Sequence, residues 1–246
     1  MLSAAAALLV FGLMYEQGDW STLWWLPKSQ VGPPVVGQQA AVRGDRHTLP
    51  HLIFVPSRTP PSDGWPLLVF LHGQGESSGA SPLPNVALQG PPQQAGRHPE
   101  QMPFAVLSPQ KPLDAQFFDD QVAASIVELV DKYIGEFALD ASRVYLTGVS
   151  QGGIGTWGLA SDQRFAHRFA AIAPVCGGLV RGTKRAAAML ADTPTWALSV
   201  RRGFERTPCC ALVRLAGPWS SYSVADEYNP SPHVCAATGR TIQFFQ

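Results

Sequence analysis

The segment Gly148-Val-Ser-Gln-Gly-Gly153 follows directly on the β-branched run Arg143-Val-Tyr-Leu-Thr147. The run predicts a strand, and residues 154–160 after the segment are compatible with a helix. A Gly-x-Ser-x-Gly pattern at such a junction is typical of a tight turn that lifts a serine hydroxyl clear of its sheet. Glycines stand two residues either side of the serine because a Cβ there would collide with the neighbouring strand and helix. We therefore expect the Ser150 hydroxyl to stand clear of the sheet, exposed at the end of its strand.

Short apolar runs recur on both sides of this turn. They lie at residues 52–55, 67–71, 104–107, 144–146, 170–175 and 195–200. Continuous apolar runs of this length are typical of strands that are buried on both faces of a parallel sheet. Each of these runs is therefore interpreted as a strand.

Helical patterns lie between the predicted strands. The clearest starts near Asp119, places Val122 and Ile126 on one apolar face, and carries acidic side chains at its N-terminus. Residues 183–191 are a further helix candidate. Strands that alternate with helices predict an α/β fold with a mostly parallel central sheet flanked by helices. Active groups should then lie at the carboxyl ends of the strands, which is where Ser150 falls.

Composition narrows the partners of the chain. Its 246 residues suit one large α/β domain, and its 18 basic and 18 acidic residues balance. Without a basic face or a charge run, we expect no nucleic-acid partner. The four cysteines contain no C-x-x-C pair, so we expect no metal site built on them.

The N-terminus and the cysteines bear on the cellular location of the protein. Residues 2–15 are apolar but too short to span a bilayer comfortably, and no Lys or Arg precedes them. We therefore expect no membrane association, although an export signal is an alternative. Free thiols in a reducing compartment are the simpler interpretation of the cysteines, which favours a cytoplasmic over a secreted protein.

A serine nucleophile needs a general base and an oxyanion hole. The segment His72-Gly73-Gln74-Gly75 follows the predicted strand 67–71, where a backbone N–H could meet a substrate oxygen. The backbone N–H groups of Gln74 and Gln151 are the expected donors of the hole. His72 itself is interpreted as a structural residue of this loop, and a plain glycine turn is the alternative for the whole segment.

Several motifs in order resemble one family. They are Leu68-Val-Phe-Leu-His-Gly-Gln-Gly-Glu76, Ser108-Pro-Gln110, residues 143–153, Gly155-Thr-Trp157 and residues 169–178. Over roughly residues 50–198 the chain resembles the phospholipase/carboxylesterase branch of the α/β-hydrolases and the neighbouring predicted peptidase or esterase group. This resemblance implies a serine hydrolase of carboxylic esters that uses no cofactor or metal. It also implies Ser150 as nucleophile, with Gln74 and Gln151 supplying backbone N–H groups.

The chain departs from that family after residue 198. The family continues the strand into His-Gly-x-x-Asp and later supplies a Gly-His-Asp-x-Trp-like segment, whereas this chain reads Leu198-Ser-Val-Arg-Arg-Gly-Phe204. The last fifty or so residues hold three of the four cysteines and many Arg, Ser and Pro. A frame-shifted or alternatively spliced reading of the gene would produce such a change, and sequencing the transcript across codons 197–202 tests that hypothesis.

The remaining candidates for a triad follow from the order Ser, acid, His along the chain. Two histidines come after Ser150, and His233 is preferred as base because His167 falls near the helix behind the serine. Glu205 is the preferred acid because it follows the predicted strand 195–200. Asp226 is the second choice, and Asp192 precedes the strand and so lies at the wrong end.

These observations predict three regions and two functions. We expect an N-terminal extension and linker at residues 1–39, a hydrolase core at 40–200 and a divergent segment at 201–246. The first function is a carboxylesterase that acts on a small-molecule ester. The alternative is a catalytically impaired protein of the same fold, serving in ligand binding or as a non-productive isoform.

Overall fold

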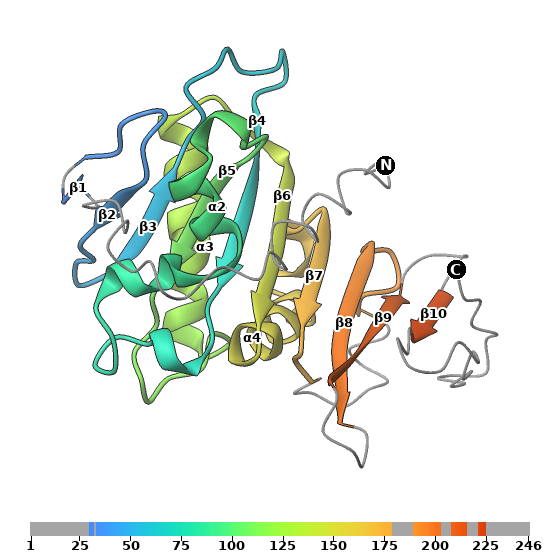
Figure 1. Ribbon diagram of the computed structural model, residues 1–246. Helices are drawn as coiled ribbons and strands as arrows, with labels where there is room; N and C mark the ends of the chain where they lie inside the picture. Colours follow the sequence, from blue (N-terminus) through green and yellow to red (C-terminus); the bar gives the residue numbers. More distant parts are fainter. Residues whose placement is uncertain (1–29, 32, 179–188, 203–207, 216–220, 225–246) are drawn as a thin grey trace.

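One sheet runs through the described part of the chain. The computed structural model describes residues 30–31, 33–178, 189–202, 208–215 and 221–224. The strands are β1 (Gln30–Val31), β2 (Ala40–Val42), β3 (His51–Phe54), β4 (Trp65–Leu71), β5 (Ala105–Pro109), β6 (Leu139–Val149), β7 (Ala171–Val175), β8 (Thr195–Arg202), β9 (Pro208–Leu215) and β10 (Ser221–Val224). They form a 10-stranded sheet in the order β1-β2-β3-β5-β4-β6-β7-β8-β9-β10 (Figure 1).

The middle of the sheet is parallel and its margins are largely antiparallel. Strands β5, β4, β6, β7 and β8 pair in parallel. β3 pairs antiparallel with both β2 and β5, and β9 pairs antiparallel with β8 and β10. The parallel centre matches the prediction from the apolar runs, whereas the antiparallel margins were not predicted.

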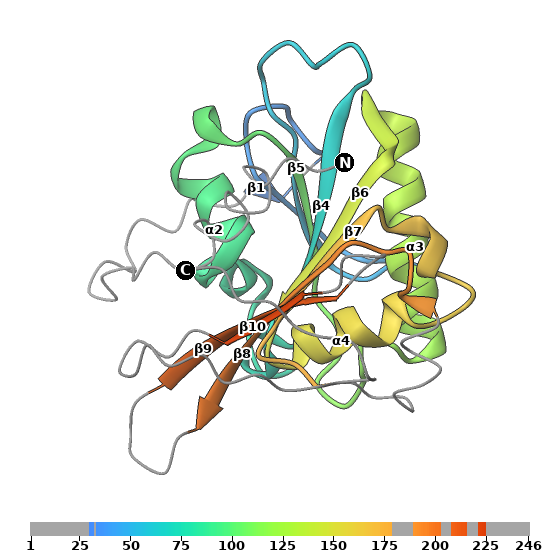
Figure 2. The same cartoon turned by 90° about the vertical axis from the view of Figure 1, so that its right-hand side faces the viewer.

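Helices cover both faces of the sheet. The α-helices are α2 (Gly90–Arg97), α3 (Asp120–Glu136) and α4 (Gln151–Ala160). Short 3-10 helices are η2 (Gln74–Glu76), η3 (Leu83–Leu88), η4 (Pro99–Gln101) and η5 (Ala166–Arg168). Seen along the sheet, α2 lies on one side and α3 and α4 lie on the other (Figure 2).

The two faces of β4 explain this layering. Successive side chains of a strand point to opposite faces. Leu67, Val69 and Leu71 belong to the large apolar cluster that also contains the buried face of α3. Phe70 points the other way, because a Cβ built on Gly90 of α2 would lie 2.9 Å from its ring. Every residue of β4 is buried, as expected for a strand packed on both faces.

The predicted elements are confirmed with small shifts of their ends. All six apolar runs are strands, and the helix predicted from Asp119 is α3, with Asp119 as its N-cap residue. The Asp119 side chain does not cap α3; its Oδ2 accepts a hydrogen bond from the Gln116 N–H at 2.7 Å. The predicted helix at 183–191 lies largely outside the described residues.

The chain reverses direction across the sheet between β4 and β6. From β4 it continues through α2 to β5 on one side, whereas from β6 it continues through α4 to β7 on the other. At such a switch point the loops after the two strands diverge and leave a crevice at their carboxyl ends. The loop after β4 begins at His72, and the turn after β6 contains Ser150.

Candidate active site

The serine turn, residues 148–153, holds Ser150 in an unusual backbone conformation. Ser150 has φ 55° and ψ −112°, a region that residues with a side chain rarely adopt. Its N–H donates to the carbonyl of Val175 at 2.8 Å, and its carbonyl accepts from the N–H of Ile154 at 3.0 Å. Ser150 is exposed, as the sequence predicts, although its flanking glycines are buried. Surrounding structure must hold such a conformation, which costs about 1–3 kcal/mol.

Backbone crowding holds the serine turn. A Cβ on Gly148 would lie 2.5 Å from the carbonyl of Gly152, and a Cβ on Gly152 would overlap the carbonyl oxygen of Leu71. Real Cβ atoms essentially never come this close. The glycines at 148 and 152 are therefore required by the approach of β6, α4 and β4 to one another.

The His72 loop, residues 72–78, lies beside the serine turn. Leu71 and Gly148 are register partners in the parallel pair of β4 and β6. A Cβ on Gly152 would lie 2.7 Å from the carbonyl oxygen of His72, so the loop starts against the first turn of α4. The structure thus brings the segments that contain Gln74 and Gln151 together at the switch point.

His72 is a buried residue of this loop. Its Nε2 accepts a hydrogen bond from the Lys111 N–H at 3.2 Å, so Nδ1 carries the proton and donates to the Gly73 carbonyl at 2.6 Å. Burial lowers the pKa of His72 to about 4. A neutral ring whose two nitrogens both have hydrogen-bond partners agrees with the structural role that the sequence predicts for His72.

Lys111 is a functional candidate that the sequence analysis missed. It directly follows the Ser108-Pro-Gln110 motif, which was the available signal. Its side chain has 0% exposure, and burial lowers the pKa of its ammonium. The Nζ atom donates to the Ser77 hydroxyl at 3.0 Å and to the Pro112 carbonyl at 3.0 Å. The ammonium thus lies against the His72 loop, to which it hydrogen-bonds through Ser77.

Some other triad candidates can be placed. His167 is exposed in η5, which follows helix α4, and Asp192 precedes β8. Glu205, Asp226 and His233 lie outside the described residues. Among the residues that the structure does describe, no histidine hydrogen-bonds to Ser150.

Within the described part of the chain, no group of three or more His, Cys, Asp or Glu side chains could hold a metal ion. None of its helices is both long and apolar enough to cross a membrane.

Comparisons with known proteins point to one class. No protein-family model matches the chain. Over 141 residues it is 30% identical to a bifunctional acetylxylan esterase/xylanase from Neocallimastix patriciarum, which covers 54% of this chain and 19% of that protein. A thermostable esterase of known structure is 30% identical with a TM-score of 0.52, over 62% of this chain and 44% of that one. A feruloyl esterase module from Clostridium thermocellum is 17% identical, with a TM-score of 0.49 over 75% of this chain and 71% of that one.

The sheet, its helices and the likeness to the thermostable esterase define an α/β-hydrolase fold. The chain spans about a fifth of the length of the curated relative that it matches. Both 30% identical proteins have an esterase activity in their names, one of them beside a xylanase, so the resemblance to α/β-hydrolase esterases is confirmed. The narrower phospholipase/carboxylesterase branch is consistent with these relatives.

Proposed function

We propose that this protein is a serine hydrolase that cleaves carboxylic esters through an acyl-enzyme at Ser150. The observation that carries the proposal is the exposed Ser150, held at φ 55° on the turn between β6 and α4. This conformation supports a nucleophile elbow, a turn in which strain keeps the serine hydroxyl above the sheet. The esterase relatives support the same chemistry.

The first step is acylation of Ser150. Its Oγ attacks the ester carbonyl carbon, a C–O bond forms, and the Oγ proton passes to a general base. The resulting oxyanion accepts hydrogen bonds from the backbone N–H groups of Gln74 and Gln151. The C–O bond to the leaving group then breaks, and the alcohol departs with the proton from the base.

The second step is hydrolysis of the acyl-enzyme. Water attacks the acyl carbon, gives one proton to the base, and releases the carboxylic acid while Ser150 regains its hydrogen. We propose His233 as the base and Glu205 as the acid that orients it, because they follow Ser150 in the required order along the chain.

A catalytically impaired protein is the second candidate. This candidate is favoured because no histidine in the described ranges hydrogen-bonds to Ser150. Both ring nitrogens of His72 already have partners, the Lys111 N–H and the Gly73 carbonyl. Serine hydrolases without a working triad keep on the order of 10³- to 10⁴-fold catalysis over water through the oxyanion hole and binding. Such a protein would bind acyl ligands and turn them over slowly.

Fluorophosphonate labelling with ester turnover separates the two candidates. For the esterase we expect stoichiometric labelling that Ser150→Ala abolishes, and p-nitrophenyl acetate turnover that His233→Ala lowers about 10³-fold or more. His167→Ala, at an exposed position, is the matched control and should keep full turnover. Labelling without ester turnover would favour the impaired protein, and no labelling of folded protein would contradict the esterase.

The first substrates to test are acylated carbohydrates and short acyl esters. The relative from Neocallimastix patriciarum is named as an acetylxylan esterase, which makes acetyl groups on xylan the first choice. A panel of p-nitrophenyl esters from acetate to palmitate, run beside acetylated xylan and a feruloyl ester, identifies the preferred acyl group. A preference for palmitate would contradict the carbohydrate-ester assignment.

A further inference from the structure

The segment between β5 and α3 hydrogen-bonds to the side chains of both residues whose backbone N–H groups are the proposed oxyanion donors. We call residues 110–118 the clamp segment. Its Lys111 Nζ donates to the Gln74 side-chain oxygen at 3.5 Å, and its Leu113 carbonyl accepts from the Gln74 Nε2 at 3.2 Å. Its Gln116 Oε1 accepts from the Gln151 Nε2 at 3.0 Å. One short segment therefore holds the side chains of two residues that lie 77 positions apart in the chain.

The contact with the His72 loop is extensive. The Gln110 Nε2 donates to the Glu76 carbonyl at 2.7 Å, and the Lys111 carbonyl accepts from the Ser78 N–H at 2.9 Å. The Leu113 N–H donates to the Ser78 carbonyl at 3.1 Å. Together with the bonds from Lys111 to His72 and Ser77, these contacts fix the loop from its first residue to its last.

The clamp segment is equally close to helix α4. Phe117 has 0% exposure, and a Cβ on Gly155 of α4 would lie 2.5 Å from its Cβ. The Phe117 ring also meets the His72 ring edge-on, with centroids 5.0 Å apart. Gln151, the first residue of α4, has no partner for its Oε1 among the described residues, so its amide is held through Nε2.

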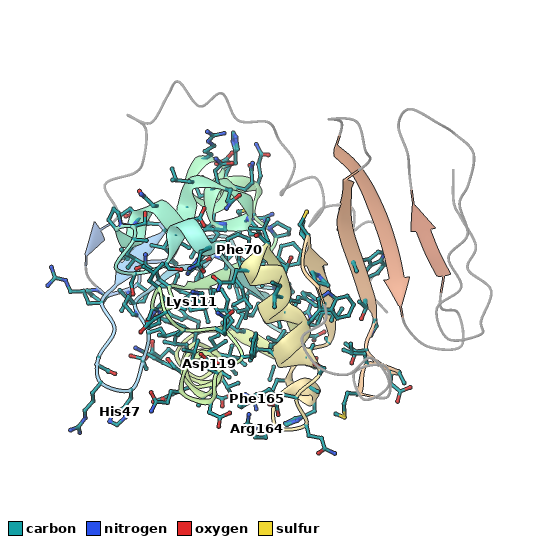
Figure 3. All side chains as sticks on the ribbon, turned by 90° about the horizontal axis from the view of Figure 1, so that it is seen from below. His47, Phe70, Lys111, Asp119, Arg164 and Phe165 are labelled. Carbon is teal, nitrogen blue, oxygen red and sulfur yellow. The ribbon has the colours of Figure 1, made fainter. Side chains whose placement is uncertain are left out.

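Lys111 is the centre of this arrangement. Viewed from the side toward which β4, β6 and β7 point, it lies among packed side chains, whereas His47 and Arg164 lie at the margin (Figure 3). A buried ammonium needs its protons accepted, and here neutral oxygens accept them. Its acceptors come from the His72 loop and the clamp segment, so satisfying the ammonium ties the two together.

We infer that Lys111 and Gln116 are positioning residues that set the distance between the N–H groups of Gln74 and Gln151. This inference rests on the proposed function, because those N–H groups matter only if an oxyanion forms between them. Donors that are fixed before the reaction stabilise the developing charge without a further reorganisation cost. Lys111 and Gln116 do not contact the substrate; they act through Gln74 and Gln151.

Amide hydrogen exchange tests the positioning part without any catalysis. Lys111→Met keeps the volume of the side chain, so we expect the fold to persist. Exchange should rise about fivefold at residues 72–78 in Lys111→Met and at residues 150–155 in Gln116→Met, as the loss of one hydrogen bond allows. The controls are the exposed Lys132→Met and Gln101→Met. Unchanged exchange, or an equal rise throughout the protein, would overturn the inference.

Labelling kinetics test the catalytic part. With a fluorophosphonate probe, Lys111→Met and Gln116→Met should each lower kinact about fivefold and leave KI within twofold of the wild type. Gln151→Met should match Gln116→Met, and the double variant should lose no more than either single variant, because one bond is removed in each case. A loss in KI alone, or additive losses in the double variant, would overturn the inference.

The two readouts keep the proposals distinguishable. If the wild type is not labelled but amide exchange rises locally in the variants as expected, the proposed function fails. The positioning of the Gln74 and Gln151 backbone N–H groups by Lys111 and Gln116 then still stands. If the wild type is labelled and the variants exchange faster at an unchanged kinact, the proposed function stands and the inference fails.

Discussion

The serine turn and the His72 loop meet at the same switch point but are held by different forces. The serine turn is fixed by backbone against backbone, with Gly148 and Gly152 packed against each other and against Leu71. The His72 loop is fixed by polar side chains, chiefly Lys111 and Gln110, which reach across from another part of the chain. The serine turn, called the crowded side below, has no room for an added atom. The stability of the His72 loop, called the polar side, depends on pH and on single polar groups.

The largest expected effect is on the crowded side. Gly152→Ala should lower the free energy of unfolding by about 3 kcal/mol or more, because the new Cβ would overlap the Leu71 carbonyl. Urea unfolding measures it. Gly75→Ala is the matched control in the His72 loop, where nothing lies within 4 Å of the added Cβ. Equal stability of the two variants would break the comparison.

Acid should affect the polar side more than the crowded one. Burial lowers the pKa of His72 from 6.5 to about 4, so the folded protein keeps this ring neutral while the unfolded chain protonates it. The resulting stability is complete above pH 6.5 and is lost as the pH falls toward 4, by about 3 kcal/mol. Buried His51 has the same shift and should contribute equally.

Urea unfolding at pH 7 and pH 4 measures this dependence. His72→Gln should remove the share that belongs to His72 and leave the share of His51, so the change between the two pH values should fall by about half. An unchanged pH dependence in this variant would mean that His72 is not the neutral, bonded residue described above.

A smaller effect is expected at the acceptor of the buried ammonium. Ser77→Ala leaves Lys111 one hydrogen bond short, which should cost about 2 kcal/mol because the donor is charged. Thermal or urea unfolding measures the loss. Ser62→Ala, at an exposed serine, should change stability by no more than about 0.5 kcal/mol. Similar losses of stability in the two variants would mean that water replaces Ser77 as a partner of the ammonium, contrary to its burial.

The smallest effect returns to the serine turn with the opposite sign. Ser150→Gly should stabilise the protein by about 1 kcal/mol, because relief of a strained φ exceeds the added chain entropy of glycine. Ser150→Ala keeps the Cβ and should leave stability near that of the wild type. If both variants are equally stable, the conformation at Ser150 is not strained.

The sequence predicts the crowded side better than the polar side. The glycines at 148 and 152 around Ser150 predict a close backbone approach, and the apolar runs predict the strands between which it occurs. The sequence around Gln116 gives no such signal, and that around Lys111 gives only its place after the Ser108-Pro-Gln110 motif. A lysine or glutamine is ordinarily exposed, and its burial depends on partners far along the chain. The antiparallel β2 escaped prediction for a related reason, since Ala40–Val42 is too short to produce a pattern.

The contact between Gly152 and the Leu71 carbonyl has a consequence for protein engineering. A turn that depends on the neighbouring strand in this way is not a portable module. Grafting residues 148–153 onto another sheet would also require the end of β4, in the register that sets Leu71 beside Gly148, and the end of β7, whose Val175 carbonyl accepts from the Ser150 N–H. The smallest transferable unit is therefore three adjacent parallel strands, β4, β6 and β7, and the first turn of one helix.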